Sequence, residues 1–268
     1  MPEVAPFQIP NLIDTHTHLT VEQFDEDRKA VINRAQESRM YAIINVGTQM
    51  ADSVSGIELA ERYDFIYTAV GIHPQECSGI TENDFDKLAQ LALHPRVVAI
   101  GEIGLDFHSD YASREQQLHT LRKQLLLADA VQKPVLIHAR QAEAEIKQEL
   151  LEWTSKRVCT DAPGVIHCFG GAFETAQAYL QMGFYISLGA YIGYPSSRAF
   201  REVVKQLPLG RLLVETDCPY LPPQRLRGHR NEPSFVCDTV LELAHIHEIE
   251  PKEVASITTS NGRHLFNV

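Results

Sequence analysis

The feature that most constrains the fold of this chain is a repeated alternation of short apolar runs with longer amphipathic stretches. The runs are rich in Val, Ile and Leu and lack polar alternation, as expected for parallel strands covered on both faces. Apolar runs that alternate with stretches of helical period predict a parallel α/β sheet. The eight runs are Leu12–His18, Tyr41–Gly47, Phe65–His73, Val97–Ile103, Pro134–His138, Val165–Phe169, Phe184–Gly189 and Leu212–Asp217.

The stretch Ser113–Gln132 illustrates the helical segments between the runs. Ser113 and Gln116 have the spacing of a capping box, which predicts the start of a helix. One face of this helix carries four apolar residues: Leu118, Leu121, Leu125 and Ala128.

Eight such units favour a closed (β/α)8 barrel over an open doubly wound sheet. The chain has 268 residues, close to the roughly 250 typical of this barrel, although the length also allows two domains. No GxGxxG or GxxxxGK[ST] motif follows any run, which removes the usual reason to prefer the open sheet. We therefore expect one TIM-barrel domain over residues 1–268.

The charge balance limits the partners of the protein. The net charge is −11, from 24 basic and 35 acidic residues. An acidic protein is poorly suited to coating duplex DNA, which requires a basic face. Any nucleic-acid binding is therefore expected at a small local site.

The cysteines and the N-terminal segment favour a cytoplasmic protein. The five cysteines form no CxxC pair, and their spacing does not resemble a disulfide framework, so reduced thiols are expected. The first residues lack the basic start and apolar core of a secretory signal. No apolar run approaches the roughly 20 residues that span a bilayer, so no membrane association is expected.

Ionisable residues gather at the ends of the apolar runs rather than at their starts. In a (β/α)8 barrel the C-terminal strand ends form the floor of the active site, so these side chains are expected to converge. Several imidazoles with carboxylates in one cleft are typical of a metal site. The predicted metal ligands are His16, His18, Glu102, His138, His167 and Asp217.

Four of these residues have a position or chemistry that suggests a specific role. His16 and His18 are two apart on a strand, so both side chains point to the same face. Glu102 is flanked by Gly101 and Gly104, which leaves room for its two oxygens to bridge two metals. Asp217 could bind one metal and also accept a proton from the attacking water. Glu102 and Asp217 are therefore the predicted catalytic residues.

Four further residues are predicted to contact substrate, with ordinary surface or structural roles as the alternative. Arg140 lies two residues beyond His138 and could grip a phosphate or carboxylate. Arg227 and Arg230 belong to a basic loop just past Asp217, and His73 ends its own run.

The neighbouring residues are assigned lesser roles. Asp106 and Glu215 are supporting candidates only. Cys168 and Cys218 are expected to point away from the cleft and to be buried.

A set of motifs in fixed order resembles one known family. These motifs are DTHTHL at 14–19, GIHP at 71–74, GEIGLD at 101–106, IHAR at 137–140, HCFGG at 167–171, ETDCP at 215–219, RGHRNEP at 227–233 and NGRHLF at 261–266. Together they resemble the TatD-related deoxyribonucleases of the amidohydrolase superfamily over nearly the whole chain. His229 stands where a Lys is common in that family, and Cys218 where a small residue is usual.

The resemblance implies a distorted TIM barrel with two divalent ions. His16, His18 and Asp217 would hold the first metal, His138 and His167 the second, and Glu102 would bridge them. It also implies a phosphodiesterase that cleaves DNA, often from the 3′ end with magnesium. Single-stranded or frayed DNA is the expected substrate, hydrolysed by a metal-activated water.

Two other functions remain open at this point. The same site could hydrolyse a carboxylic ester or amide, such as a D-aminoacyl ester or an N-acyl amino acid. A non-catalytic metal-binding scaffold is the second alternative. The sequence does not determine the metal (Mg, Mn or Zn), the physiological substrate, the oligomeric state or any protein partner. It also does not determine whether the protein acts as an exonuclease or an endonuclease.

Overall fold

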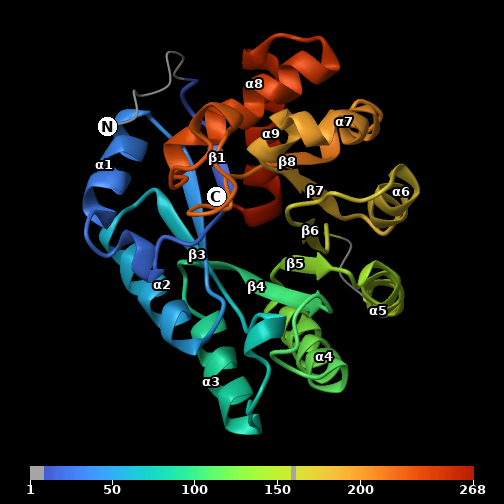
Figure 1. The fold of residues 1–268 in the computed structure, drawn as a ribbon. Helices are drawn as coiled ribbons and strands as arrows, with labels where there is room; N and C mark the ends of the chain where they lie inside the picture. The colour runs from blue at the N-terminus through green and yellow to red at the C-terminus, as the bar shows by residue number, and fades with distance from the viewer. Residues whose placement is uncertain (1–8, 158–160) are drawn as a thin grey trace. The chain divides into compact units, whose positions relative to one another are not determined.

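The computed structural model describes residues 9–157 and 161–268. It contains a sheet of eight strands that follow one another in chain order, β1 to β8 (Figure 1). Each predicted apolar run overlaps one strand, although β4 and β5 continue beyond the ends of their runs and β6 begins one residue before its run. The strand pairs with a described register are parallel. The strands are β1 (Ile13–Thr17), β2 (Ala42–Val46), β3 (Ile66–Val70), β4 (Val97–Asp106), β5 (Val135–Arg140), β6 (Gly164–Ile166), β7 (Tyr185–Leu188) and β8 (Leu212–Val214).

Helices alternate with these strands, so the predicted (β/α)8 class is confirmed. The helices are α1 (Arg28–Glu37), α2 (Met50–Arg62), α3 (Glu82–Ala92), α4 (Arg114–Val131), α5 (Glu143–Lys156), α6 (Phe173–Gln181), α7 (Arg198–Val204), α8 (Val236–His247) and α9 (Pro251–Phe266). Across residues 9–157 and 161–268, none of them combines the length and apolar character needed to cross a bilayer.

Short 3-10 turns complete the secondary structure between the longer elements. They are η1 (Glu22–Phe24), η2 (Pro74–Glu76), η3 (Ala190–Gly193), η4 (Pro195–Ser197), η5 (Leu209–Arg211), η6 (Gln224–Leu226) and η7 (Pro233–Phe235).

The chain divides into two compact units. The first unit comprises the described part of Met1–Asn45 together with Cys168–Ala176 and Ile186–Val268. The second unit comprises Val46–His167, without residues 158–160, and Gln177–Tyr185. The prediction that residues 1–268 form one domain stays a prediction.

In the first unit, β1 is joined to the segment that follows β8. The amide of His18 donates to the carbonyl of Cys218 over 2.8 Å, and that of Asp217 donates to the carbonyl of His16 over 2.9 Å. Helix α9 packs against both β1 and β8 (Figure 1). The C-terminal ends of the two strands are therefore held side by side.

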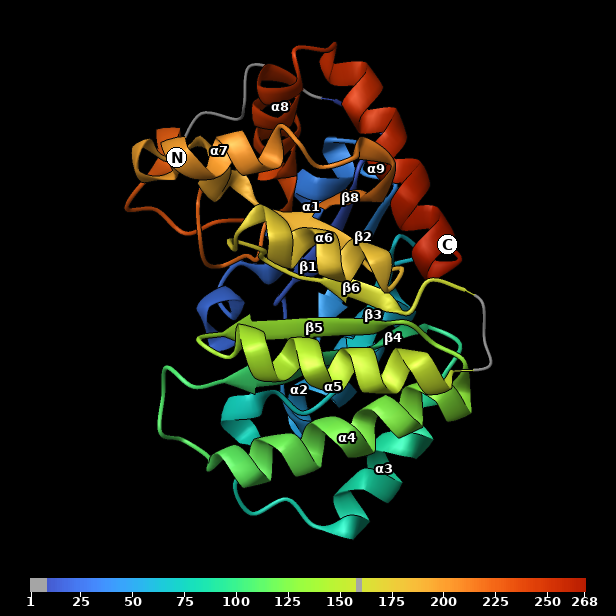
Figure 2. The ribbon, with the colours of Figure 1, turned by 90° about the vertical axis from the view of Figure 1, so that its right-hand side faces the viewer.

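In the second unit, α4 and α5 run beside β4 and β5 (Figure 2). The capping box at the start of α4 is confirmed: Ser113 Oγ accepts from the Gln116 amide, and Gln116 Oε1 accepts from the Ser113 amide. The predicted apolar face is buried at Leu121, Leu125 and Ala128, whereas Leu118 is half-buried.

The buried face of α4 also carries glutamines that the apolar pattern does not predict. Gln124 bonds both backbone groups of Ile72, with Oε1 accepting from its amide over 2.8 Å and Nε2 donating to its carbonyl over 3.0 Å. Gln117 bonds the backbone amide and carbonyl of Asp106 in the same way. These side chains satisfy buried backbone groups where β3 and β4 end.

The glycines around Glu102 are required by the neighbouring strand β5. A Cβ at Gly104, whose φ is +151°, would lie 1.9 Å from the carbonyl oxygen of His138. A Cβ at Gly101 would lie 2.5 Å from the Cβ of Leu136. Close approach of two backbones thus explains both glycines.

We predict that Gln124→Leu lowers the free energy of unfolding by about 2 to 6 kcal/mol, because two buried backbone groups lose their partners at about 1–3 kcal/mol each. Urea denaturation measures this change. Gln148→Leu on the exposed face of α5 is the matched control and should stay within about 0.5 kcal/mol of the wild type. Equal stability of the two variants would contradict the bridging role.

Candidate metal centre

Three predicted ligands of the first unit lie together at the end of β1. His16 Nε2 lies 3.2 Å from His18 Nε2 and 3.9 Å from Asp217 Oδ1. His18 Nε2 lies 3.4 Å from the same oxygen. The side chains of His16, His18 and Asp217 are 1%, 5% and 13% exposed. We call this set the first group; its ligand atoms are close enough together to hold one metal ion.

Strand alternation and a turn of unusual backbone conformation produce the first group. His16 and His18 face the same side because they are two apart across the end of β1. Asp217 follows β8 in the left-handed region, with a φ of 56°. A non-glycine residue held there costs free energy and is often found at functional sites.

Asp14 supports the turn that carries Asp217, and it was not singled out from the sequence. Its carboxylate accepts from the Thr216 amide over 3.0 Å and from the Thr216 hydroxyl over 2.6 Å. Burial raises the pKa of Asp14 well above its usual value, although the bonds from Thr216 act in the opposite direction. The one available signal was its position two residues before His16, on the same face of the strand.

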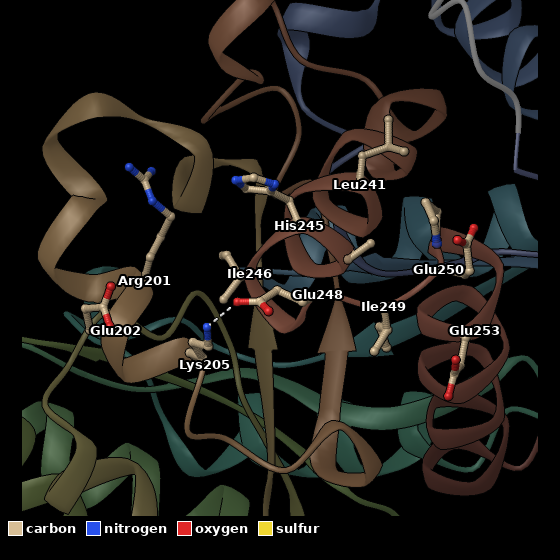
Figure 3. Close-up of a pocket in the computed structure, with 12 residues that line it drawn as sticks. Arg201, Glu202, Lys205, Leu241, His245, Ile246, Glu248, Ile249, Glu250 and Glu253 are labelled. Atoms are coloured by element: carbon tan, nitrogen blue, oxygen red, sulfur yellow. Dashed lines mark hydrogen bonds and ion pairs between the residues drawn. The ribbon is translucent and has the colours of Figure 1, made fainter.

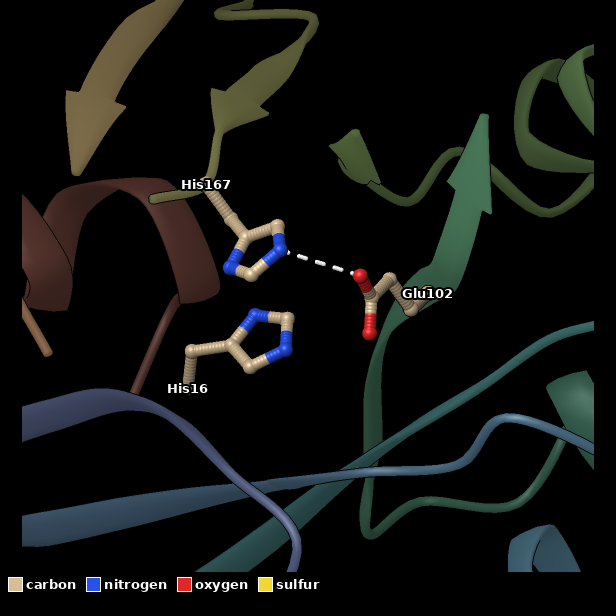
Figure 4. Close-up of side chains that lie close together, drawn as sticks. All are labelled: His16, Glu102 and His167. Atoms are coloured by element: carbon tan, nitrogen blue, oxygen red, sulfur yellow. Dashed lines mark ion pairs between the residues drawn. The ribbon is translucent and has the colours of Figure 1, made fainter. Parts of the chain in front are cut away.

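The second unit brings three other predicted residues close to Glu102, and we call these four residues the second group. Glu102 Oε1 lies 2.7 Å from His138 Nδ1, 3.0 Å from His167 Nε2 and 3.6 Å from His73 Nε2. Figure 4 shows His167 directed at the Glu102 carboxylate. His73, Glu102 and His138 also satisfy the spacing of a metal-binding set.

His73 lies among the residues of the second group. The structure places it beside Glu102, with its ring edge-on against that of His138 at 4.5 Å. Its Nδ1 accepts from the Gln75 amide, which leaves Nε2 directed toward Glu102. The geometry therefore offers His73 as a ligand, and its contact with substrate stays a prediction.

Asp106 holds His138 from the side opposite Glu102. Its Oδ2 lies 3.4 Å from His138 Nε2 and accepts from Gln75 Nε2 over 2.8 Å. Burial raises the pKa of Asp106, but hydrogen bonds from His138 and Gln75 outweigh it, so the pKa lies below its usual value. Burial lowers the pKa of His138, but its bonds to Asp106 and Glu102 raise it above its usual value. The carboxylates of Asp106 and Glu102 therefore favour the positively charged form of His138.

The donor sets fit a divalent cation. Ligands bonded at 2.0–2.1 Å with angles of roughly 90–110° lie about 3.0–3.4 Å apart. The separations of 3.2, 3.4 and 3.9 Å in the first group match or slightly exceed this spacing. In the second group, the 2.7 Å contact between His138 Nδ1 and Glu102 Oε1 is a hydrogen bond. A cation that binds this imidazole nitrogen would have to displace the shared proton.

The three predicted arginines differ in their surroundings. Arg140 ends β5 and is exposed. Arg230 is bound to Asp27 Oδ2 over 2.7 Å, and this bond lowers the pKa of Asp27. Arg227 is exposed, with its guanidinium 4.5 Å from the ring centre of Tyr194. Substrate binding by all three stays a prediction, and Arg227 is better placed for it than Arg230, whose charge Asp27 already balances.

The expectation for the cysteines is partly wrong. Cys218 is fully buried, as predicted, but Cys168 is only half-buried. Strand β6 ends at Ile166, and Cys168 has a φ of 47°, so strand alternation no longer determines its direction. Cys77, Cys218 and Cys237 are free thiols; Cys159 lies outside the described residues.

A groove on the first unit does not coincide with the candidate ligands. It has a volume of about 1030 Å³ and lies between α7, α8 and the start of α9 (Figure 3). Lys205 and Glu248 form an ion pair of 2.5 Å across it. None of the predicted site residues lines this groove.

The family description TatD related DNase matches residues 13–267. This chain belongs to the TatD-related DNase family. It is 40% identical to an uncharacterized metal-dependent hydrolase, YabD of Bacillus subtilis, over 96% of this chain and 99% of that one. It is 32% identical to a 3′-5′ ssDNA/RNA exonuclease TatD of Citrobacter rodentium, over 96% and 98% of the two chains.

A solved structure of the same family supports the fold. The crystal structure of YjjV, a TatD homologue from Escherichia coli, matches with a TM-score of 0.89 and 32% identity. The match covers 96% of this chain and 98% of that one. Membership of the TatD-related family confirms the predicted class, a metal-dependent hydrolase on a TIM barrel.

We predict that Asp106→Asn weakens Mn²⁺ binding at the second group by about 10- to 100-fold, because residues that orient metal-binding histidines typically contribute this much. Isothermal calorimetry on metal-stripped protein measures the affinity. Asp64→Asn, on an exposed side chain ahead of β3, should bind like the wild type. Unchanged affinity in Asp106→Asn would refute the orienting role.

Proposed function

We propose that this TatD-related protein is a 3′-to-5′ exonuclease on single-stranded DNA that works with two divalent cations. The observation that carries the proposal is the presence, in each unit, of a buried group of imidazoles and carboxylate at strand ends. Relatives of nearly full-length similarity named as 3′-5′ ssDNA/RNA exonucleases support this substrate class.

The ligand assignment follows from the two groups. His16, His18 and Asp217 would hold one cation, and Glu102, His138 and His167 the other, with His73 as a further candidate. In a (β/α)8 barrel the active site lies at the C-terminal ends of the strands, and each of the two groups lies at such strand ends. Glu102 has two oxygens and is the proposed bridge.

The residues of this chain would divide the chemistry between them. When bound, divalent cations lower the pKa of a coordinated water toward 7 and neutralise phosphate charge. Asp217 is the member of the first group most open to solvent. It is therefore best placed to accept the proton of the attacking water and to return it to the leaving 3′ oxygen. Arg140 and Arg227 would bind non-bridging phosphate oxygens.

We predict that Asp217→Asn lowers kcat on 5′-labelled single-stranded DNA by about 10²- to 10⁴-fold, because it removes the proton acceptor. Gel analysis of product length measures the rate and distinguishes stepwise removal from internal cleavage. Asp86→Asn, exposed on α3, should retain wild-type activity, and circular dichroism should show both variants folded. Normal turnover by Asp217→Asn would exclude its catalytic role.

A substrate panel tests the proposed bond specificity. Metal-stripped protein restored with Mg²⁺, Mn²⁺ or Zn²⁺ should degrade single-stranded DNA and leave D-aminoacyl esters and N-acyl amino acids intact. Hydrolysis of an acyl substrate alone would replace the proposed function with a carboxylic ester or amide hydrolase.

A further inference from the structure

An exposed aromatic ring lies beside the first group. Tyr220 follows Asp217 by three residues and is 48% exposed. Its ring lies 6.1 Å from the ring of His18 at an angle of 63°. Tyr41 and Tyr111 are also exposed, so exposure alone does not distinguish Tyr220. What distinguishes it is direct ring contact with a proposed metal ligand.

The backbone of Tyr220 is fixed at both of its polar groups. Its amide donates to the carbonyl of Asp217 over 2.9 Å, and its carbonyl accepts from Asn231 Nδ2 over 2.8 Å. Asn231 is itself buried and also donates to the carbonyl of Thr216. The backbone that carries the ring is therefore fixed before substrate arrives, and the ring itself rests edge-on against His18, which reduces the entropy lost on binding.

The charge of the protein favours a contact of this kind. With a net charge of −11, the chain gains little from general attraction to phosphates. Stacking of a base on an aromatic ring does not depend on that attraction and tolerates any base. Single strands offer unstacked bases for such contacts, whereas a duplex keeps its bases stacked inside.

We propose that Tyr220 is the stacking platform for a base at the 3′ end of the bound single strand, and so determines the preference for unpaired ends. This inference rests on the proposed function, because it assumes a nucleic-acid substrate at the first group. Stacking on Tyr220 would place the terminal nucleotide beside His18 and Asp217, where its phosphodiester is to be cleaved.

The test compares Tyr220→Ala and Tyr220→Phe on two oligonucleotides. One carries ordinary bases, and the other has abasic sites at its two 3′-terminal nucleotides. On the ordinary strand, Tyr220→Ala should raise KM by about 5- to 150-fold with kcat nearly unchanged, and Tyr220→Phe should behave like the wild type. On the abasic strand, wild type and Tyr220→Ala should have equal KM values.

Two controls separate stacking from a structural effect. Tyr41→Ala removes an exposed ring at the start of β2 and should leave KM unchanged. Mn²⁺ affinity of Tyr220→Ala should equal that of the wild type, which shows that His18 is undisturbed.

The possible failures are distinguishable. Two results on an active wild-type protein would show that the stacking role is wrong while the proposed function stands. One is an unchanged KM of Tyr220→Ala on the ordinary strand, and the other is an equal rise in its KM on the ordinary and the abasic strand. If the wild type degrades neither strand with any of the three metals, the proposed function fails and this inference fails with it.

Discussion

The structure depends on one constraint: buried imidazole nitrogens and carboxylate oxygens face one another at close range. In the first group the ring nitrogens of His16 and His18 are 3.2 Å apart, with Asp217 Oδ1 within 4 Å of both. In the second group, two imidazole nitrogens lie within 3.0 Å of Glu102 Oε1. Lone pairs directed at one another require a shared proton or a cation between them.

The scaffold meets this constraint by fixing the backbone rather than by packing alone. Gln124 and Gln117 anchor the strand ends next to His73 and at Asp106. Asp14 holds the turn before Asp217, and the glycines of β4 let β5 approach closely. His16, Glu102 and His138 lie on the strands themselves, and these contacts fix the turns that carry the remaining ligands just beyond the strand ends.

Much of the fold and of the site was predictable because both depend on local pattern. Apolar runs determine where strands form, and the position of a residue at the end of a run determines which edge it occupies, as for Glu102 and His138. Contacts between distant segments were not predictable in this way. The pairing of Arg230 with Asp27 and of Gln124 with Ile72, and the exposure of Cys168, depend on turns and neighbours that carry no local periodicity.

Anomalous diffraction from crystals soaked in Mn²⁺ tests the central claim most directly. The account predicts two strong peaks, one about 2 Å from the donor atoms of His16, His18 and Asp217, and one at the same distance from those around Glu102. Peaks confined to surface carboxylates, or none at either group, would contradict it.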